Sequence, residues 1–133
     1  MFGYVAGLPA FLGYFAVGLA MLVGFSQVYA YATPHKELNL IREGNNAAVI
    51  AYLGALFGFS LPLASAAANS VSIIDFIIWA IIGGIVQIIA FFAASYTMDD
   101  IAQKITDGNV SAGAWAGGIA LAVGLLNAAC MTY

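Results

Sequence analysis

The chain has 133 residues, of which 64% are hydrophobic and only 7% charged, and its formal net charge is −3. Soluble domains carry about a quarter charged residues, so a chain this apolar and this short has the bilayer as its natural solvent. Because a spanning helix needs roughly 20 apolar residues, four spans with short loops would use nearly the whole chain and leave no room for a soluble domain.

Four apolar stretches predict membrane-spanning helices at 8–31, 46–68, 73–96 and 111–131. Their interiors contain no Asp, Glu, Lys, Arg or His, any of which would cost about 3 kcal/mol at the centre of a spanning helix on insertion scales. The first stretch has no Lys or Arg before it, so it lacks the positive region of a signal peptide and is expected to be retained. The fold class is therefore an all-α membrane protein with four transmembrane helices.

Two polar connectors, 33–45 and 97–109, hold all three basic residues: Lys36, Arg42 and Lys104. An even number of spans separates the connectors, so both face the same side of the membrane. The positive-inside rule places them in the cytoplasm. Both termini, and the short turn around residues 69–75, are then expected outside.

A weak internal repeat with an offset of 64 residues relates the two halves of the chain. Thr33, Ile41, Gly44, Asn45, Ala48 and Gly54 reappear as Thr97, Ile105, Gly108, Asn109, Ala112 and Gly118. We interpret the chain as one transmembrane domain, 1–133, made of two like hairpins, repeat one at about 8–68 and repeat two at about 73–133. Because each repeat contains two spans, both insert the same way up, and a pseudo-twofold four-helix bundle is expected.

Each connector is expected to form a short cytoplasmic amphipathic helix that ends in a Gly-Asn step. Gly44 and Gly108 suit the left-handed position after a helix, and Asn45 and Asn109 can cap the spans that follow. At the start of these helices, Thr33 before Pro34 fits an N-cap followed by a first-position proline. Thr97 with Asp100 fits a variant of the capping box.

Small residues at four-residue spacing line three of the spans. Examples are Gly54 with Gly58, Gly113 with Gly117, the run Ala112, Ala116, Ala120, Gly124 and Ala128, and the run Ala16, Ala20 and Gly24. Lipid supplies no hydrophobic drive for helix association, so close backbone approach must supply the packing energy. Packing within one chain explains any one of these stripes. A bundle of four helices needs fewer small-residue stripes than this sequence contains. A homo-oligomer is therefore expected.

Three uncharged polar side chains within the spans, Gln27, Gln87 and Asn127, are candidates for intramembrane contacts. Amides in lipid usually form hydrogen bonds between helices, and the alternative is a polar path for an ion or small solute. We interpret the connectors as solvated loops, and their acidic side chains and His35 as residues exposed to water. No catalytic constellation is visible, so we expect no enzyme, cofactor, metal site or nucleic-acid partner.

Several segments resemble a known family: Thr33-Pro34-His35-Lys36-Glu37, the asparagine–alanine segment at 45–48, the segment 62–67 and the ending 127–133. Over essentially the whole chain they are similar to small bacterial inner-membrane proteins of domain-of-unknown-function family three-fifty. The resemblance implies a bacterial plasma-membrane location and an association with envelope-stress proteins of the phage-shock type. It supplies no catalytic residues.

Two functional hypotheses follow. The first is a structural or adaptor protein whose connectors recruit a peripheral cytoplasmic partner, suggested by the paired connectors and by the lack of intramembrane charge. The second is a small oligomeric channel or transport component, suggested by the surplus of small-residue stripes and by Gln27, Gln87 and Asn127. Membrane lipids surround the protein in either case.

Overall fold

The computed structural model describes residues 6–33 and 37–131, in which every regular element is a helix. Four helices are long and apolar enough to cross a membrane, and these confirm the expected spans with ends that differ by at most two residues. Two short helices fall in the connectors. The elements in chain order are α1 (Leu8–Ala32), α2 (Glu37–Arg42), α3 (Asn46–Asn69), α4 (Ile73–Thr97), α5 (Ile101–Thr106) and α6 (Val110–Ala129).

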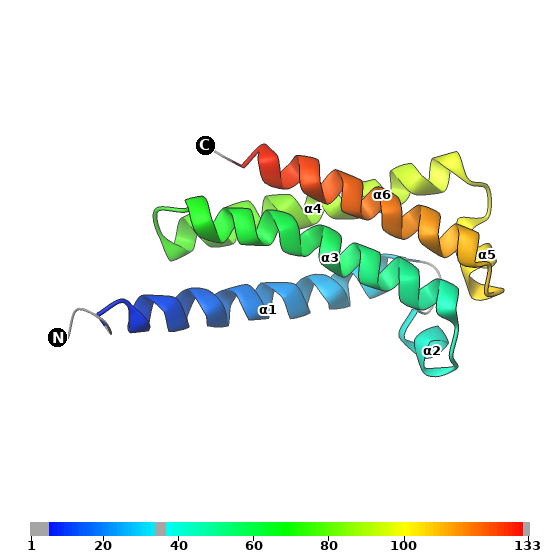
Figure 1. Ribbon diagram of the computed structural model, residues 1–133, viewed down its shortest axis with the longest axis horizontal. Helices are drawn as coiled ribbons and strands as arrows, with labels where there is room; N and C mark the ends of the chain where they lie inside the picture. Colours follow the sequence, from blue (N-terminus) through cyan, green and yellow to red (C-terminus); the bar gives the residue numbers. More distant parts are fainter. Residues whose placement is uncertain (1–5, 34–36, 132–133) are drawn as a thin grey trace.

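The four long helices lie lengthwise beside one another, and α2 and α5 lie at one end of the bundle (Figure 1). Helices α3 and α6 run in the same direction and form the most extensive contact. Helix α4 packs against both of them, and α1 packs against α3 and α4.

Glycines allow the backbones of α3 and α6 to touch. A Cβ on Gly113 would lie 2.2 Å from the main-chain oxygen of Ala47, and a Cβ on Gly54 would lie 2.3 Å from the Cα of Gly117. Both distances are shorter than any real Cβ contact, so only glycine fits at these positions. Dispersion between closely packed backbones then holds the pair together where lipid provides no hydrophobic drive.

The α3–α6 contact departs from the expected pseudo-twofold arrangement. A twofold axis would bring equivalent residues of the two repeats together, such as Gly54 and Gly118. Instead Gly54 faces Gly117, while Gly118 is exposed and a Cβ on it would meet no atom within 4 Å. Positions 64 residues apart therefore have different surroundings on α3 and α6.

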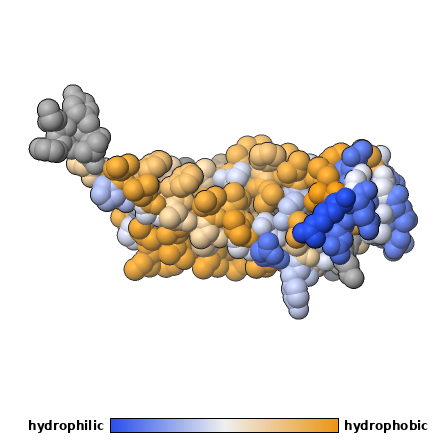
Figure 2. Space-filling model, turned by 90° about the horizontal axis from the view of Figure 1, so that it is seen from below, coloured by the Kyte–Doolittle hydropathy of each residue, from blue (hydrophilic) through white to orange (hydrophobic). Residues whose placement is uncertain are grey.

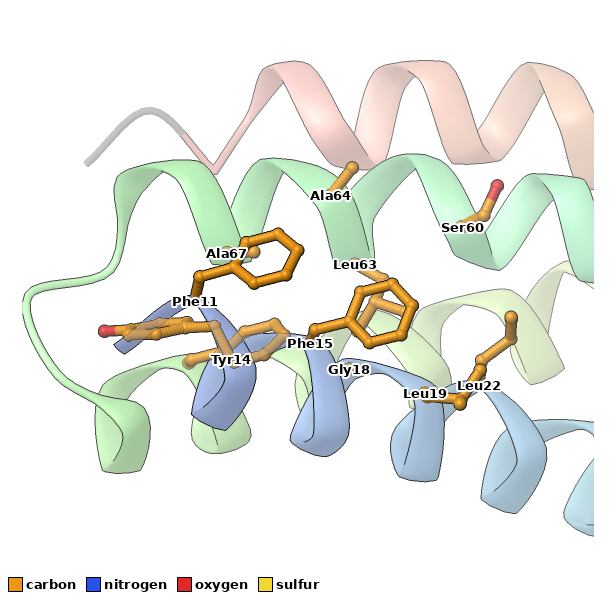
Figure 3. A pocket seen from close by; sticks show the side chains of 11 residues that line it. Phe11, Tyr14, Phe15, Gly18, Leu19, Leu22, Ser60, Leu63, Ala64 and Ala67 are labelled. Atoms are coloured by element: carbon orange, nitrogen blue, oxygen red, sulfur yellow. The ribbon is translucent and has the colours of Figure 1, made fainter. Parts of the chain in front are cut away.

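Helix α1 is the most exposed of the four, and aromatic stacking contributes to its contacts with α3 and α4. Tyr14 stacks on Phe76 with a ring separation of 5.5 Å, and Phe25 stacks on Phe59 at 4.3 Å. Between α1 and α3 lies an apolar cavity of about 340 Å³, which Phe11, Phe15 and other side chains line (Figure 3). The flank of the bundle is hydrophobic and the polar residues gather at one end, as expected for a surface in contact with lipid (Figure 2).

The helix starts differ in part from the expected caps. Thr97 is the last residue of α4, and Asp100 precedes α5 with a left-handed φ of 56° and no side-chain cap hydrogen bond, so the predicted capping box is wrong. Thr33 follows α1 as its C-cap, and Pro34 lies outside the described residues. The threonine hydroxyls are used elsewhere: Thr97 Oγ1 donates to the main-chain oxygen of Ala94 at 2.7 Å, a local bond that competes with capping.

A variant of the capping box, whose return bond comes from the residue before the N-cap, occurs at α4, where sequence reasoning missed it. The main-chain N–H of Asp75 donates to Ser72 Oγ, and the main-chain N–H of Val71 donates to Asp75 Oδ2, each at 3.1 Å. The pattern Ser-x-x-Asp before an apolar run was the available signal. This box fixes the start of α4 after the tight turn from α3.

Candidate functional site

The two Gly-Asn steps adopt nearly the same backbone conformation. Gly44 has a φ of 84° and Gly108 a φ of 83°, in the left-handed region that favours glycine. Asn45 accepts a side-chain hydrogen bond from the main-chain N–H of Ala48 at 3.0 Å, and Asn109 accepts one from Ala112 at 3.3 Å. In both connectors the chain therefore leaves a short helix and enters a spanning helix within two residues.

Asn45 also joins the two connectors. Its side-chain Nδ2 donates to the main-chain oxygens of Ile105 at 2.8 Å and Thr106 at 3.1 Å, at the C-terminal end of α5. These carbonyls are among those that a helix leaves without an intrahelical partner. One asparagine thus caps the start of α3 with its side-chain oxygen and bonds to the last carbonyls of α5 with its nitrogen.

The short helices bury apolar side chains under the bundle end. On α5, Ile101 and Ile105 are buried while Gln103 is exposed. On α2, Leu38 and Ile41 are half-buried against the core, and Asn39 and Arg42 are exposed. Both short helices therefore contact the core through apolar side chains, while Asn39, Arg42 and Gln103 are exposed.

A polar groove of about 370 Å³ separates the two Gly-Asn steps. Glu43 and Asp107 line it from opposite connectors, together with Asn46, Thr106 and the two glycines. Asp107 Oδ1 accepts a hydrogen bond from Gln103 Nε2 at 3.0 Å, and Glu43 is exposed. The groove can receive a hydrogen-bonding or positively charged group from outside the bilayer.

The structure brings two of the three predicted intramembrane polar residues together. Gln87 is buried, its Nε2 donates to the main-chain oxygen of Ala120 at 3.0 Å, and its Oε1 accepts from Asn127 Nδ2 at 3.2 Å. Asn127 Nδ2 also lies 3.2 Å from the main-chain oxygen of Gly83. These bonds join α4 to α6, whereas Gln27 is exposed on α1 and lies apart from them.

Within residues 6–33 and 37–131, no group of three His, Cys, Asp or Glu side chains is placed to hold a metal ion. His35 lies outside the described residues, and Cys130 is free and exposed at the opposite end of the bundle from the connectors.

The sequence matches a known protein family over nearly its whole length. The family model described as Domain of Unknown Function (DUF350) matches residues 3–131. The chain belongs to the DUF350 family. Relatives named UPF0719 inner membrane protein YjfL, from Escherichia coli strain K12 and from Escherichia coli O157:H7, are each 43% identical over 126 residues, which are 95% of this chain and 96% of theirs. No solved structure matches the chain.

With its four apolar helices, this DUF350 member is a multi-pass inner-membrane protein. The relatives' names do not denote an enzyme. The family match confirms the resemblance inferred from the sequence.

Proposed function

We propose that this DUF350 protein is a membrane adaptor whose polar end recruits a peripheral protein on the cytoplasmic side. The observation that carries the proposal is the groove between the two Gly-Asn steps, which is polar, open and built on helices fixed from both repeats. Its two carboxylates favour a partner that presents a basic side chain. A peripheral protein of the phage-shock type is the first candidate, a choice that rests on the family resemblance and not on the groove.

A photo-crosslinking amino acid tests this adaptor function. Placed at Asn46, which lines the groove, it should capture the candidate partner in living cells. Placed at Val71, an exposed residue in the turn at the opposite end, it should not. Glu43→Lys with Asp107→Lys should lower the yield from Asn46. Equal capture from both positions, or recovery of the protein alone from cells that express the candidate, would contradict the proposal.

The adaptor proposal includes an orientation, with the connectors in the cytoplasm and both termini outside. Its support is the location of Lys36, Arg42 and Lys104 in the connectors. Alkaline phosphatase fused after Tyr133 should be active, and a green fluorescent protein fused there should be dark. The opposite pair of results would place the groove on the outer face and exclude a cytoplasmic partner.

The repeat organisation is also part of the proposal. The equal φ angles of Gly44 and Gly108, and the matching caps of Asn45 and Asn109, support two hairpins of like construction. In each hairpin the first spanning helix packs on the second, α1 on α3 and α4 on α6. The amphipathic α2 and α5 occupy corresponding places in the two hairpins.

An oligomeric channel or transport component is the alternative, and it has less support. Gln87 and Asn127 use their hydrogen bonds on each other and on main-chain oxygens, which favours a packing role. Purified protein in liposomes tests the alternative directly. Solute flux that is lost in Gln87→Leu and kept in Gln27→Leu would favour a polar path over the adaptor.

A further inference from the structure

The apolar cavity between α1 and α3, which we call the α1–α3 groove, lies in the half of the bundle away from the connectors (Figure 3). In this half the glycines of α1 lie against α4. A Cβ on Gly13 would lie 3.3 Å from Ile73 Cδ1, and a Cβ on Gly18 would lie 3.5 Å from Phe76 Cζ. Helix α1 is thus supported by α4 from below, and α3 forms the opposite wall of the groove.

Aromatic rings form much of the groove. Tyr14 stacks on Phe76 with ring centres 5.5 Å apart, and Phe11 stacks on Phe15 at 5.8 Å. Phe76 is buried, whereas Phe11 and Phe15 are 59% and 58% exposed. The groove therefore has a packed floor and opens sideways onto the surface that faces lipid.

The length and depth of the groove match one leaflet of the bilayer. Its α1 wall runs from Phe11 to Leu22, which is about 16 Å of helix. The hydrocarbon region of one leaflet is about 15 Å thick, half of the about 30 Å of the whole bilayer. The middle residue of α1 is Ala20, so the groove lies in the leaflet away from the connectors, which is the outer leaflet in the proposed orientation.

The chemistry and size of the groove restrict what can fill it. Among the described residues that line it, only Tyr14 and Ser60 have polar side-chain atoms, so water would lack the hydrogen-bond partners that it needs. A helix segment of the same length, about 10 Å across, would require about 1,200 Å³, but the groove holds about 340 Å³. If it stayed empty, its lining atoms would lose their dispersion partners on one side. A single hydrocarbon chain satisfies all three conditions.

We propose that the α1–α3 groove binds one acyl chain of a phospholipid with a zwitterionic headgroup, and that this chain completes the contact between α1 and α3. The headgroup lies beside the turn between α3 and α4. All three basic residues of the chain, Lys36, Arg42 and Lys104, are in the connectors, so this end offers no cation that would attract an anionic lipid. Asp75, half-buried in the first turn of α4, adds negative charge there. The site does not depend on the adaptor function.

Fluorescence quenching by phospholipids with brominated chains tests this site. Trp79→Phe and Trp115→Phe remove the native tryptophans, and Phe76→Trp places a reporter in the groove floor. Vesicles of brominated zwitterionic phospholipid should quench the reporter. Ala64→Phe, at an exposed position on α3 that lines the groove, should at least halve the quenching, because its ring takes the place of the chain. Ala16→Phe is the matched control, since Ala16 is exposed on α1 but does not line the groove.

A second filling variant covers the case in which Ala64→Phe does not fold. Gly18→Leu fills the groove from α1, where a Cβ meets Phe76 only at an ordinary contact distance. Circular dichroism checks the helix content of every variant. An unquenched reporter, or quenching that folded filling variants leave unchanged, would overturn the proposal. Stronger quenching by a brominated anionic phospholipid would also overturn it.

Native mass spectrometry of protein extracted in a mild detergent identifies the occupant independently. We expect a species heavier by one phospholipid, lost in Ala64→Phe and kept in Ala16→Phe. A protein dimer that is lost in Ala64→Phe would instead show that a second copy of the chain fills the groove, and that result would contradict the lipid site.

Discussion

Asn45 Nδ2 donates to the main-chain oxygen of Ile105 at 2.8 Å, across 60 residues of chain. The bond ties the start of the second span of repeat one to the end of the short helix of repeat two. Asn109, at the equivalent position, caps α6 with its side-chain oxygen. Among the residues that the structure describes, Asn45 thus both caps its own helix and bonds to the other connector.

Asn45→Asp should destabilise the protein more than Asn109→Asp does. Aspartate caps a helix about as well as asparagine, but at position 45 it loses the N–H donor and places a carboxylate against the carbonyls of Ile105 and Thr106. We expect Asn45→Asp to cost about 1–3 kcal/mol and Asn109→Asp to cost within about 0.5 kcal/mol. Thermal unfolding in detergent measures both, and equal losses would show that the bond to α5 contributes little.

Gly44→Val and Gly108→Val should reduce stability to a similar extent. A Cβ on either glycine would have no atom within 4 Å, so the penalty comes from the left-handed backbone and not from a clash. That conformation costs a residue with a Cβ about 1–2 kcal/mol. Gly44→Asn and Gly108→Asn are the controls, because asparagine tolerates this region better. Thermal stability and membrane abundance are measured together, and two valine variants as stable as wild type would refute the strain argument.

Gln87→Leu should destabilise the bundle, whereas Gln27→Leu should not. The first change removes two hydrogen bonds between α4 and α6 and leaves Asn127 with fewer partners, at about 0.5–2 kcal/mol for interhelical bonds in membranes. Gln27 is exposed on α1, so its replacement by leucine makes the lipid face more apolar. A double-mutant cycle of Gln87→Leu with Asn127→Leu should be non-additive. Strict additivity would mean that the two amides do not interact.

Gly113→Ala should disrupt the α3–α6 contact, and Gly118→Ala should be tolerated in the single chain. A Cβ at position 113 would lie 2.2 Å from the backbone oxygen of Ala47, which cannot move without shifting α3. Overpacking of this kind costs about 1–3 kcal/mol or more. Dilute detergent, in which single chains prevail, is the medium for unfolding measurements on both variants. Similar stabilities would mean that the helices separate readily to admit the methyl group.

The sequence alone determined the membrane class, the number of spans and their ends within two residues. These features depend on apolar length and on the chemistry of single residues: long uncharged runs enter lipid, and helices begin and end at residues with the right caps. The cap at Ser72 was missed although its Ser-x-x-Asp pattern precedes an apolar run. The predicted cap at Thr97 was wrong because its hydroxyl donates to the main-chain oxygen of Ala94 instead.

Only the tertiary structure decided which small-residue stripes meet. Gly54 and Gly118 occupy equivalent places in the two repeats, yet one is packed against Gly117 and the other is open. It also decided that Gln87 pairs with Asn127 and not with Gln27. Helical periodicity defines the faces of each helix, but the choice of face depends on how closely two backbones can approach. That closest distance depends on both helices together, so the sequence of one helix alone does not predict it.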